Sequence, residues 1–280
     1  MKIIHPVCCG VDVLEAEAMI GTLNGDTFMN VLDIRNVSKK YGAGKSYRIT
    51  ALDNVSLTVS ENEFVGIMGT SGSGKTTLLN VASGIDRCDN GEIYIWDDEI
   101  CAMPKNELSL FRRENIGMVF QDFNLLNSLT IKENIMVPLI LSGKYEMTED
   151  DTVDRLAEAM DIGDILERYP YEISGGQQQR AAICRAIVNN PKILFADEPT
   201  GNLDSKTSEK ILSYFEFIHD EYKAAILMVT HDPFTACHCD RVVFIEDGHV
   251  TGEISRKADK TSFFNDILEA LQSSNDTKGV

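Results

Sequence analysis

The sequence predicts an α/β fold: a mainly parallel sheet with crossover helices, an antiparallel β subdomain at one edge and an inserted α-helical subdomain. Short apolar runs alternate with helical patterns in the last third of the chain, as expected for buried parallel strands. Two early segments have alternating apolar positions, which is typical of antiparallel strands near an edge. A block at about 122–178 has mostly helical patterns and interrupts the alternation.

The edge strands are expected at about 31–37 and 49–59, where polar and apolar side chains alternate imperfectly. Residues 1–28 follow neither a helical nor a strand period, so we expect a poorly ordered N-terminal extension there. The main domain is therefore expected at 29–250, and a C-terminal tail with a short helix at 251–280.

The core strands and helices follow in order along the chain. The predicted strands are at 64–68, 92–96, 116–120, 193–196, 225–229 and 242–245. The predicted helices are at about 75–82, 131–141, 148–160, 176–189 and 204–222. In the tail, Phe264, Ile267, Leu268 and Leu271 recur at helical spacing. This pattern predicts a helix that either docks on the body or binds a partner.

The composition is that of a folded protein: 280 residues, 43% hydrophobic and 25% charged. No apolar run approaches the roughly 20 residues that cross a bilayer, and acids interrupt any signal-peptide core near the start. Seven Cys without regular spacing are typical of a reducing compartment. We therefore expect a cytoplasmic location.

The formal net charge of -18 bears on possible partners. Non-specific binding of DNA or RNA depends on Lys and Arg side chains that neutralise phosphates. A nucleic acid is therefore not an expected partner, although a local basic patch would still allow one.

A phosphate-binding turn is predicted between the strand at 64–68 and the helix at 75–82, where the sequence reads GTSGSGKT. The glycines let successive backbone N–H groups converge on an anion, and the helix N-terminus adds partial positive charge. Lys75 can reach the β and γ phosphates, and the Thr76 hydroxyl can bind Mg²⁺. The fold is therefore predicted to be a P-loop NTPase of the RecA-like type. Its candidate nucleotide-binding residues are Gly69, Thr70, Ser71, Gly72, Ser73, Gly74, Lys75, Thr76 and Thr77.

The candidate hydrolytic residues stand at the ends of two other predicted strands. ILFADE ends in Asp197 and Glu198, and ILMVTHD contains His231. Ligands of open α/β sheets bind at the carboxyl ends of the strands. Asp197 is therefore a candidate for the Mg²⁺ shell, Glu198 for the base that activates water, and His231 for a donor to the γ-phosphate.

A second anion-binding turn is predicted in ISGGQQQR, where Ser and two glycines open another helix. Its candidate residues are Ser174, Gly175, Gly176 and Gln177. Such a sequence usually forms a capped helix start. Two such helix ends nevertheless suggest that one nucleotide is gripped from two sides, which requires either a folded-back chain or a dimer.

The strings GTSGSGKT, ISGGQ, ILFADEPTGNLD and VTHD together resemble the nucleotide-binding subunits of ABC transporters. The resemblance implies that Gln121 senses the γ-phosphate and Mg²⁺ near the membrane subunit. It implies that Tyr41 stacks on adenine and that Asp204 belongs to the D-loop. It also implies that Ser174 and Gly176 contact the ATP of the opposite protomer.

The resemblance covers about 31–250 and extends to one branch of the family. The segment VFQDFNLLNSLTIKENIMVPL with DEPTGNLD is similar to macrolide exporters, lipoprotein-release ATPases and bacitracin-type antimicrobial-peptide exporters. It is also similar to the cell-division ATPase of the same branch. Ile173 departs from the Leu that usually opens the signature, a volume-conserving change.

These resemblances imply a head-to-tail homodimer that uses ATP and Mg²⁺ and drives a separate membrane permease. Its location would be peripheral, on the inner face of the cell membrane. Export or clearance of antimicrobial peptides or lipid-linked compounds is the favoured task. A regulatory ATPase that signals to wall-modifying enzymes would share every site residue. A soluble relative acting on DNA or ribosomes is disfavoured. Such proteins usually carry two cassettes, a long coiled coil, or basic and zinc-bearing insertions, and none of these is seen in this sequence.

Overall fold

The computed structural model describes residues 20–23, 26–42, 48–143 and 151–276. Its centre is a six-stranded sheet with the strand order β11-β10-β4-β9-β8-β7. All neighbours in this sheet are parallel except β10 and β11. The strands are β4 Phe64–Met68, β7 Ile116–Val119, β8 Ile193–Asp197, β9 Ala225–Thr230, β10 Arg241–Glu246 and β11 His249–Ser255.

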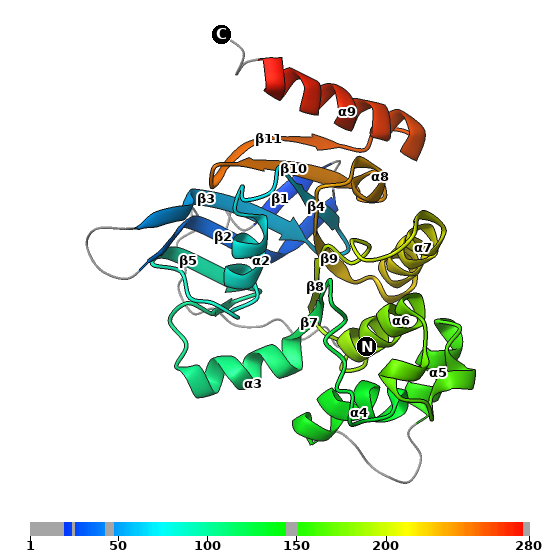
Figure 1. The fold of residues 1–280 in the computed structure, drawn as a ribbon. Coiled ribbons are helices and arrows are strands. Elements are labelled where there is room, and N and C mark those ends of the chain that lie inside the picture. The colour runs from blue at the N-terminus through cyan, green and yellow to red at the C-terminus, as the bar shows by residue number, and fades with distance from the viewer. Residues whose placement is uncertain (1–19, 24–25, 43–47, 144–150, 277–280) are drawn as a thin grey trace, which may run out of the picture.

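A second, antiparallel sheet lies beside this one (Figure 1). Its order is β1-β2-β5-β6, and β3 pairs with β2 along the edge opposite β5. Its strands are β1 Ile20–Leu23, β2 Asp26–Tyr41, β3 Ile49–Ser60, β5 Asn90–Ile95 and β6 Asp98–Glu99. The pairing of β2 and β3 agrees with the antiparallel edge strands predicted from the alternating pattern.

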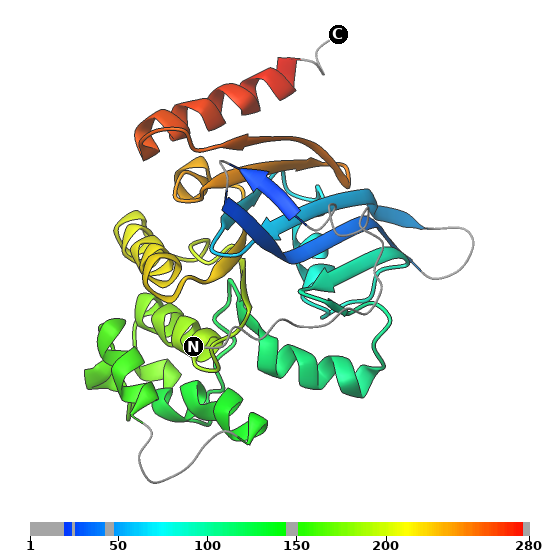
Figure 2. The same ribbon diagram turned by 180° about the vertical axis from the view of Figure 1, so that it is seen from behind.

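Helices cover both faces of the six-stranded sheet. Figures 1 and 2 show α4 to α7 on one side, while α2 lies with the antiparallel sheet on the other. The helices are α2 Lys75–Ala82, α3 Lys105–Asn115, α4 Ile131–Ser142, α5 Thr152–Ala159, α6 Gly175–Ile187, α7 Ser205–Tyr222, α8 Pro233–Ala236 and α9 Lys260–Asp276. Short 3-10 turns at Gly163–Ile165 and Pro170–Glu172 join α5 to α6.

Two apolar clusters form the core, one on each face of the central sheet. Successive side chains of a strand point to opposite faces, so Val65 and Ile67 of β4 join one cluster, while Phe64 and Met68 join the other. All four are buried. The continuous burial of β4 explains why its sequence reads as an apolar run without alternation.

The two ends of the chain depart from the sequence-based picture. Strand β1 and the first residues of β2 lie within the segment 1–28 that shows no period, and residues 1–19 lie outside the described ranges. The tail contains β11 and a helix, α9, of 17 residues. In α9, Phe263 and Ile267 are buried in the core, so this helix docks on the body of the protein.

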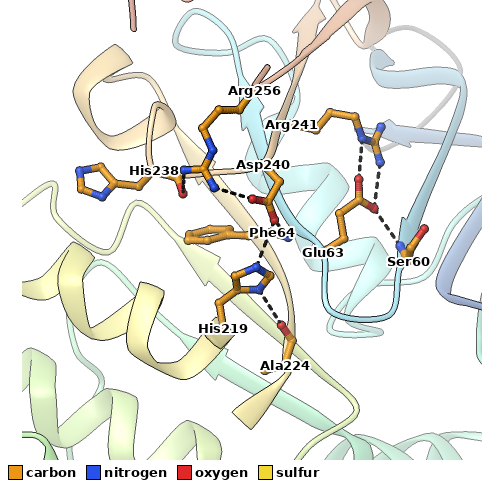
Figure 3. Close-up of polar contacts among 9 residues, drawn as sticks. All are labelled: Ser60, Glu63, Phe64, His219, Ala224, His238, Asp240, Arg241 and Arg256. Atoms are coloured by element: carbon orange, nitrogen blue, oxygen red, sulfur yellow. Dashed lines mark hydrogen bonds and ion pairs between the residues drawn. The ribbon is translucent and has the colours of Figure 1, made fainter. Parts of the chain in front are cut away.

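An ion-pair network links α7 to the starts of β4 and β10 in the central sheet (Figure 3). The His219 ring on α7 lies with Nε2 3.1 Å from Asp240 Oδ2, and Arg256 binds the other oxygen at 2.6 Å. The Phe64 backbone N–H donates to Asp240 as well, at 3.0 Å. Burial of the His219 ring is the largest effect and opposes protonation, but the hydrogen bond to Asp240, the charge of Asp240 and the bond to the Ala224 carbonyl act together in the other direction, so the pKa of His219 is raised.

This network predicts a pH-dependent stability. A raised histidine pKa stabilises the fold fully below the ordinary value of about 6.5, and the gain is lost as pH rises through the folded-state value. We expect His219→Gln to lower the free energy of unfolding more at roughly pH 6 than at roughly pH 9. Urea denaturation at both values measures this difference. His249→Gln is the matched control, since His249 is exposed and 3.7 Å from Asp53; an effect of His219→Gln that is equal at both pH values would contradict the prediction.

Candidate functional site

The predicted phosphate turn lies between β4 and α2, and its glycines are required by close packing. A Cβ at Gly69 would lie 2.2 Å from the carbonyl oxygen of Ile245. Gly74 has φ +106°, and a Cβ there would lie 2.4 Å from the carbonyl oxygen of Ala51. No other residue type fits at either position without moving the backbone. The turn is thereby held in one backbone shape at both glycines.

Lys75 provides the positive charge at this turn. Its side chain is largely buried, with 5% of the residue exposed, and its Nζ donates to the Thr70 carbonyl at 2.8 Å. Burial lowers the pKa of Lys75, while the nearby carboxylates of Glu198 and Asp197 act in the opposite direction. The ammonium group is therefore held beside the turn by a neutral acceptor that a phosphate oxygen can replace.

Thr76 and Asp197 come together as the sequence predicts for a metal site. The Thr76 hydroxyl donates to Asp197 Oδ1 at 3.2 Å, which links the start of α2 to the end of β8. Burial raises the pKa of Asp197, opposed by the Thr76 bond. A hydroxyl and a carboxylate are oxygen donors of the kind that Mg²⁺ prefers. Ser73 Oγ is buried nearby without a hydrogen-bond partner among the described residues, which fits a turn built for a polar ligand.

Glu198 and His231 form a close pair, within ion-pairing distance of each other. His231 Nδ1 lies 3.0 Å from Glu198 Oε2, and the two residues follow β8 and β9. Glu198 has a positive φ of 44°, and its backbone N–H donates to the Val229 carbonyl at 3.0 Å. A left-handed backbone at a carboxylate residue is a strained conformation of the kind found at functional sites. The strain turns the Glu198 side chain toward His231.

A cavity of about 630 Å³ brings Lys75 and the Glu198–His231 pair together, whereas Thr76 and Asp197 are not among its lining residues. It is lined by the phosphate turn, both members of the Glu198–His231 pair, and Gln121. Its full lining is Met68, Gly69, Thr70, Ser71, Lys75, Gln121, Glu198, His231 and Leu271. Leu271 belongs to α9, so the docked tail helix closes one side of the cavity. A tail residue at this position was not predicted.

Gln121 reaches the cavity but is engaged with the loop after β8. Its Nε2 donates to Asn202 Oδ1 at 3.3 Å, and the Asn202 amide donates to the Gln121 carbonyl at 3.2 Å. Asn202 also binds the Asp122 carboxylate at 2.8 Å. Asn202 was not among the predicted site residues. These two hydrogen bonds between the loops directly link Gln121 to the segment that leads to Asp204.

The second predicted anion site is a well-formed helix N-terminus, at the start of α6. Ser174 caps α6 by accepting from the Gln177 N–H, and the Gln177 side chain accepts from the Ser174 N–H at 2.9 Å. A Cβ at Gly176 would lie 2.6 Å from the Thr207 methyl group, so glycine is required there. Among the described residues that line the Lys75 cavity, none belongs to Ser174–Gln177. The two helix ends of one chain therefore do not both line this cavity.

Asp204 and Tyr41 occupy structurally defined positions. Asp204 caps α7, accepting from the backbone of Lys206 and from the Thr207 hydroxyl at 2.6 Å. Tyr41 is 41% exposed at the end of β2, and its hydroxyl donates to Asp86 Oδ2 at 2.8 Å. The ring is therefore held in place while remaining free to stack. Asp86 was not predicted, because it is 45 residues from Tyr41 in sequence.

The chain is similar in sequence to known proteins over most of its length. The protein-family model for ABC transporters matches residues 52–201. An uncharacterised ABC transporter ATP-binding protein, YvcR of Bacillus subtilis, is 49% identical over 87% of this chain and 94% of its own length. The bacitracin export ATP-binding protein BceA of Halalkalibacterium halodurans is 43% identical over 86% of this chain and 95% of its own length.

The solved structures agree with these sequence relatives. The ATP-binding cassette MJ0796 of Methanocaldococcus jannaschii, solved as a dimer in a post-hydrolysis state with ADP and Pi, matches with a TM-score of 0.75 and 39% identity. The match covers 81% of this chain and 99% of that one. The predicted α/β fold and its P-loop NTPase core are confirmed. The chain belongs to the ABC transporter family, as one of its ATP-binding ATPases.

Proposed function

We propose that this chain hydrolyses ATP in a head-to-tail homodimer and thereby drives a separate membrane permease that exports or clears antimicrobial peptides or lipid-linked compounds. The observation that carries the ATPase assignment is the Glu198–His231 pair, 3.0 Å apart, in the same cavity as Lys75. The relative named for bacitracin export supports the substrate class.

Within the site, each side chain has a separate task. Lys75 and the turn N–H groups would hold the β and γ phosphates, and Tyr41 would stack on adenine. Thr76 and Gln121, with Asp197 through water, would hold Mg²⁺, which neutralises phosphate charge. Glu198 would accept a proton from the attacking water, and His231 orients that carboxylate. No step requires a group outside this set except the second helix end.

The second helix end is supplied by the partner copy in this proposal. The start of α6 has free N–H groups and the Ser174 hydroxyl, which favour an anion, and lies away from the Lys75 cavity of its own chain. A head-to-tail arrangement would place this start over the partner's γ-phosphate. The dimeric cassette MJ0796 supports such an assembly.

A membrane partner accounts for how a chain of this kind acts on lipids or peptides at the cell envelope. In the part of the chain that the structure describes, no helix is long and apolar enough to cross a bilayer. Macrolide export ATP-binding/permease proteins match over only about a third of their length, 32% in one case. Their names place both functions in one chain. Here the permease would be a second protein, which holds the ATPase on the inner face of the membrane.

Purification from detergent-solubilised membranes of the native host tests this proposal. We expect an integral permease to co-purify and to stimulate ATP hydrolysis in proteoliposomes when a substrate peptide such as bacitracin is present. Recovery of ATPase without any permease would overturn it. Co-purification of a membrane protein that activates a wall hydrolase, without effect on peptide binding or release, would favour the regulatory ATPase instead.

A further inference from the structure

Two cysteine side chains lie in contact beside the antiparallel sheet, away from the phosphate turn. The Cys88 and Cys101 sulfurs are 2.8 Å apart, about 0.8 Å more than the roughly 2.05 Å of a disulfide bond. Both side chains are partly exposed, and both sulfurs are free thiols. A reagent from solvent can therefore reach a pair that needs little movement to become a disulfide.

The backbone on each side of the pair is fixed by hydrogen bonds. Cys101 follows the β5–β6 hairpin, whose ladder continues through the bond from the Ile100 N–H to the Ile93 carbonyl at 2.9 Å. Next to Cys88, the Asp89 N–H donates to the Ser38 carbonyl of β2 at 2.9 Å. The approach of the two thiols therefore follows from the pairing of the strands.

The two thiols differ in reactivity because one hydrogen bond acts on them in opposite directions. The bond from Cys101 lowers the pKa of Cys88 to about 7, against the effect of burial. The same bond raises the pKa of Cys101, and burial adds to the increase. Lys39 also favours the Cys88 thiolate, whereas Asp89 disfavours it, and Glu99 disfavours that of Cys101. Cys88 is therefore the nucleophile of the pair.

Cys88 lies in the loop that positions Tyr41, here called the 86–89 loop. Asp86 accepts from the Tyr41 hydroxyl at 2.8 Å and pairs with Lys39 Nζ at 2.9 Å. Asp89 accepts from the Lys40 N–H at 2.7 Å. A covalent bond at Cys88 would restrict the same loop that holds the aromatic ring. This functional consequence, though not the thiol chemistry itself, rests on the proposed stacking of Tyr41 on adenine.

We propose that Cys88 and Cys101 form an oxidisable dithiol, and that its disulfide fixes the 86–89 loop. The oxidant is a low-molecular-weight disulfide. The Cys88 thiolate attacks one sulfur of this disulfide, forming a mixed disulfide and releasing one small thiolate. Cys101 then loses its proton, attacks Cys88 Sγ and releases the second small thiol. The two protein thiols are oxidised, and the one small disulfide is reduced to two thiols.

The sequence makes this modification simple to detect. No Lys or Arg lies between Arg87 and Lys105, so trypsin releases both cysteines in one peptide, 88–105. After treatment of the full-length protein with oxidised glutathione and alkylation of free thiols, we expect this peptide to be lighter than its reduced form by two hydrogens and to carry no alkyl group. We also expect the thermal midpoint to rise by roughly 5 °C. Recovery of the peptide with both thiols alkylated would overturn the proposal.

Single serine variants separate the two steps. In Cys101→Ser, we expect Cys88 to retain one glutathionyl group, because the resolving thiol is missing. In Cys88→Ser, we expect peptide 88–105 to carry neither glutathione nor a disulfide, because Cys101 is the weaker nucleophile. Neither variant should gain thermal stability on oxidation. Cys237→Ser, altered at a buried thiol elsewhere, is the matched control and should oxidise like the wild type.

The thermal midpoint and the ATP affinity of Tyr41→Ala test the disulfide proposal and the adenine assignment separately. A disulfide that forms without raising the thermal midpoint would contradict fixation of the 86–89 loop. In the reduced protein, Tyr41→Ala should weaken ATP binding by about tenfold if the ring stacks on adenine. Unchanged ATP affinity in that variant would count against the adenine assignment but would leave the disulfide chemistry intact.

Discussion

We expect the replacement of Glu198 by Gln to lower steady-state ATP hydrolysis by about 10³-fold while ATP binding stays nearly intact. Gln has almost the shape of Glu and can still contact His231, but its amide cannot accept a proton from the attacking water. Because ATP binds without being cleaved, the variant should also accumulate as an ATP-dependent dimer. Phosphate release measures the first effect, and sedimentation with and without ATP measures the second.

The matched control for this variant is Glu221→Gln, which makes the same change on an exposed residue near the end of α7. It should hydrolyse ATP at the wild-type rate. If Glu198→Gln retained the full rate as well, Glu198 could not be the base. If hydrolysis stopped but no dimer formed with ATP, the assembly proposed here would lose its support.

We expect the replacement of Lys75 by Ala to weaken ATP binding by about 100-fold, the size that corresponds to the loss of hydrogen bonds to a charged phosphate. The side chain is largely buried and its ammonium group is bonded to the neutral Thr70 carbonyl. Ala is a good helix former at the first position of α2. Titration with a fluorescent ATP analogue measures the affinity, and circular dichroism checks that the helix content is unchanged.

Lys257→Ala is the comparison for this variant, because Lys257 is exposed and lies beyond the central sheet. Its ATP affinity should equal that of the wild type. Equal affinity in Lys75→Ala and the wild type would remove Lys75 from the phosphate site, and with it the reason for placing the nucleotide at this turn.

The local parts of the fold could be predicted because short stretches of sequence determine them. The predicted bounds of β4 and α2 match those observed, since an apolar run, a glycine turn and a helix follow one another without a gap. Helix α3 and strand β11 were not predicted. Burial along α3 is confined to Leu108, and β11 is almost wholly exposed, so neither carries a clear hydrophobic period.

The site was predictable where one segment supplies the chemistry and unpredictable where distant segments meet. Thr76 and Asp197 could be paired through the general rule that ligands gather at the carboxyl ends of parallel strands. The positive φ of Glu198 could not be predicted from the sequence, because glutamate has no preference for that conformation. The contacts of Tyr41 with Asp86 and of Gln121 with Asn202 depend on tertiary packing alone.

The proposed meeting of the two helix ends, the starts of α2 and α6, involves two chains. Ser174 is 99 positions from Lys75 in the sequence, and its turn does not line the Lys75 cavity. The sequence raised either a folded-back chain or a dimer as the way to join them. Our proposal is a dimer in which one triphosphate is held from both sides.

The most direct test is a structure of Glu198→Gln bound to ATP and Mg²⁺. The account predicts a closed dimer in which the γ-phosphate held by Lys75 of one protomer lies within hydrogen-bond distance of Ser174 Oγ and the Gly176 N–H of the other. A closed, nucleotide-bound dimer whose Ser174 turns stay far from every phosphate would contradict it.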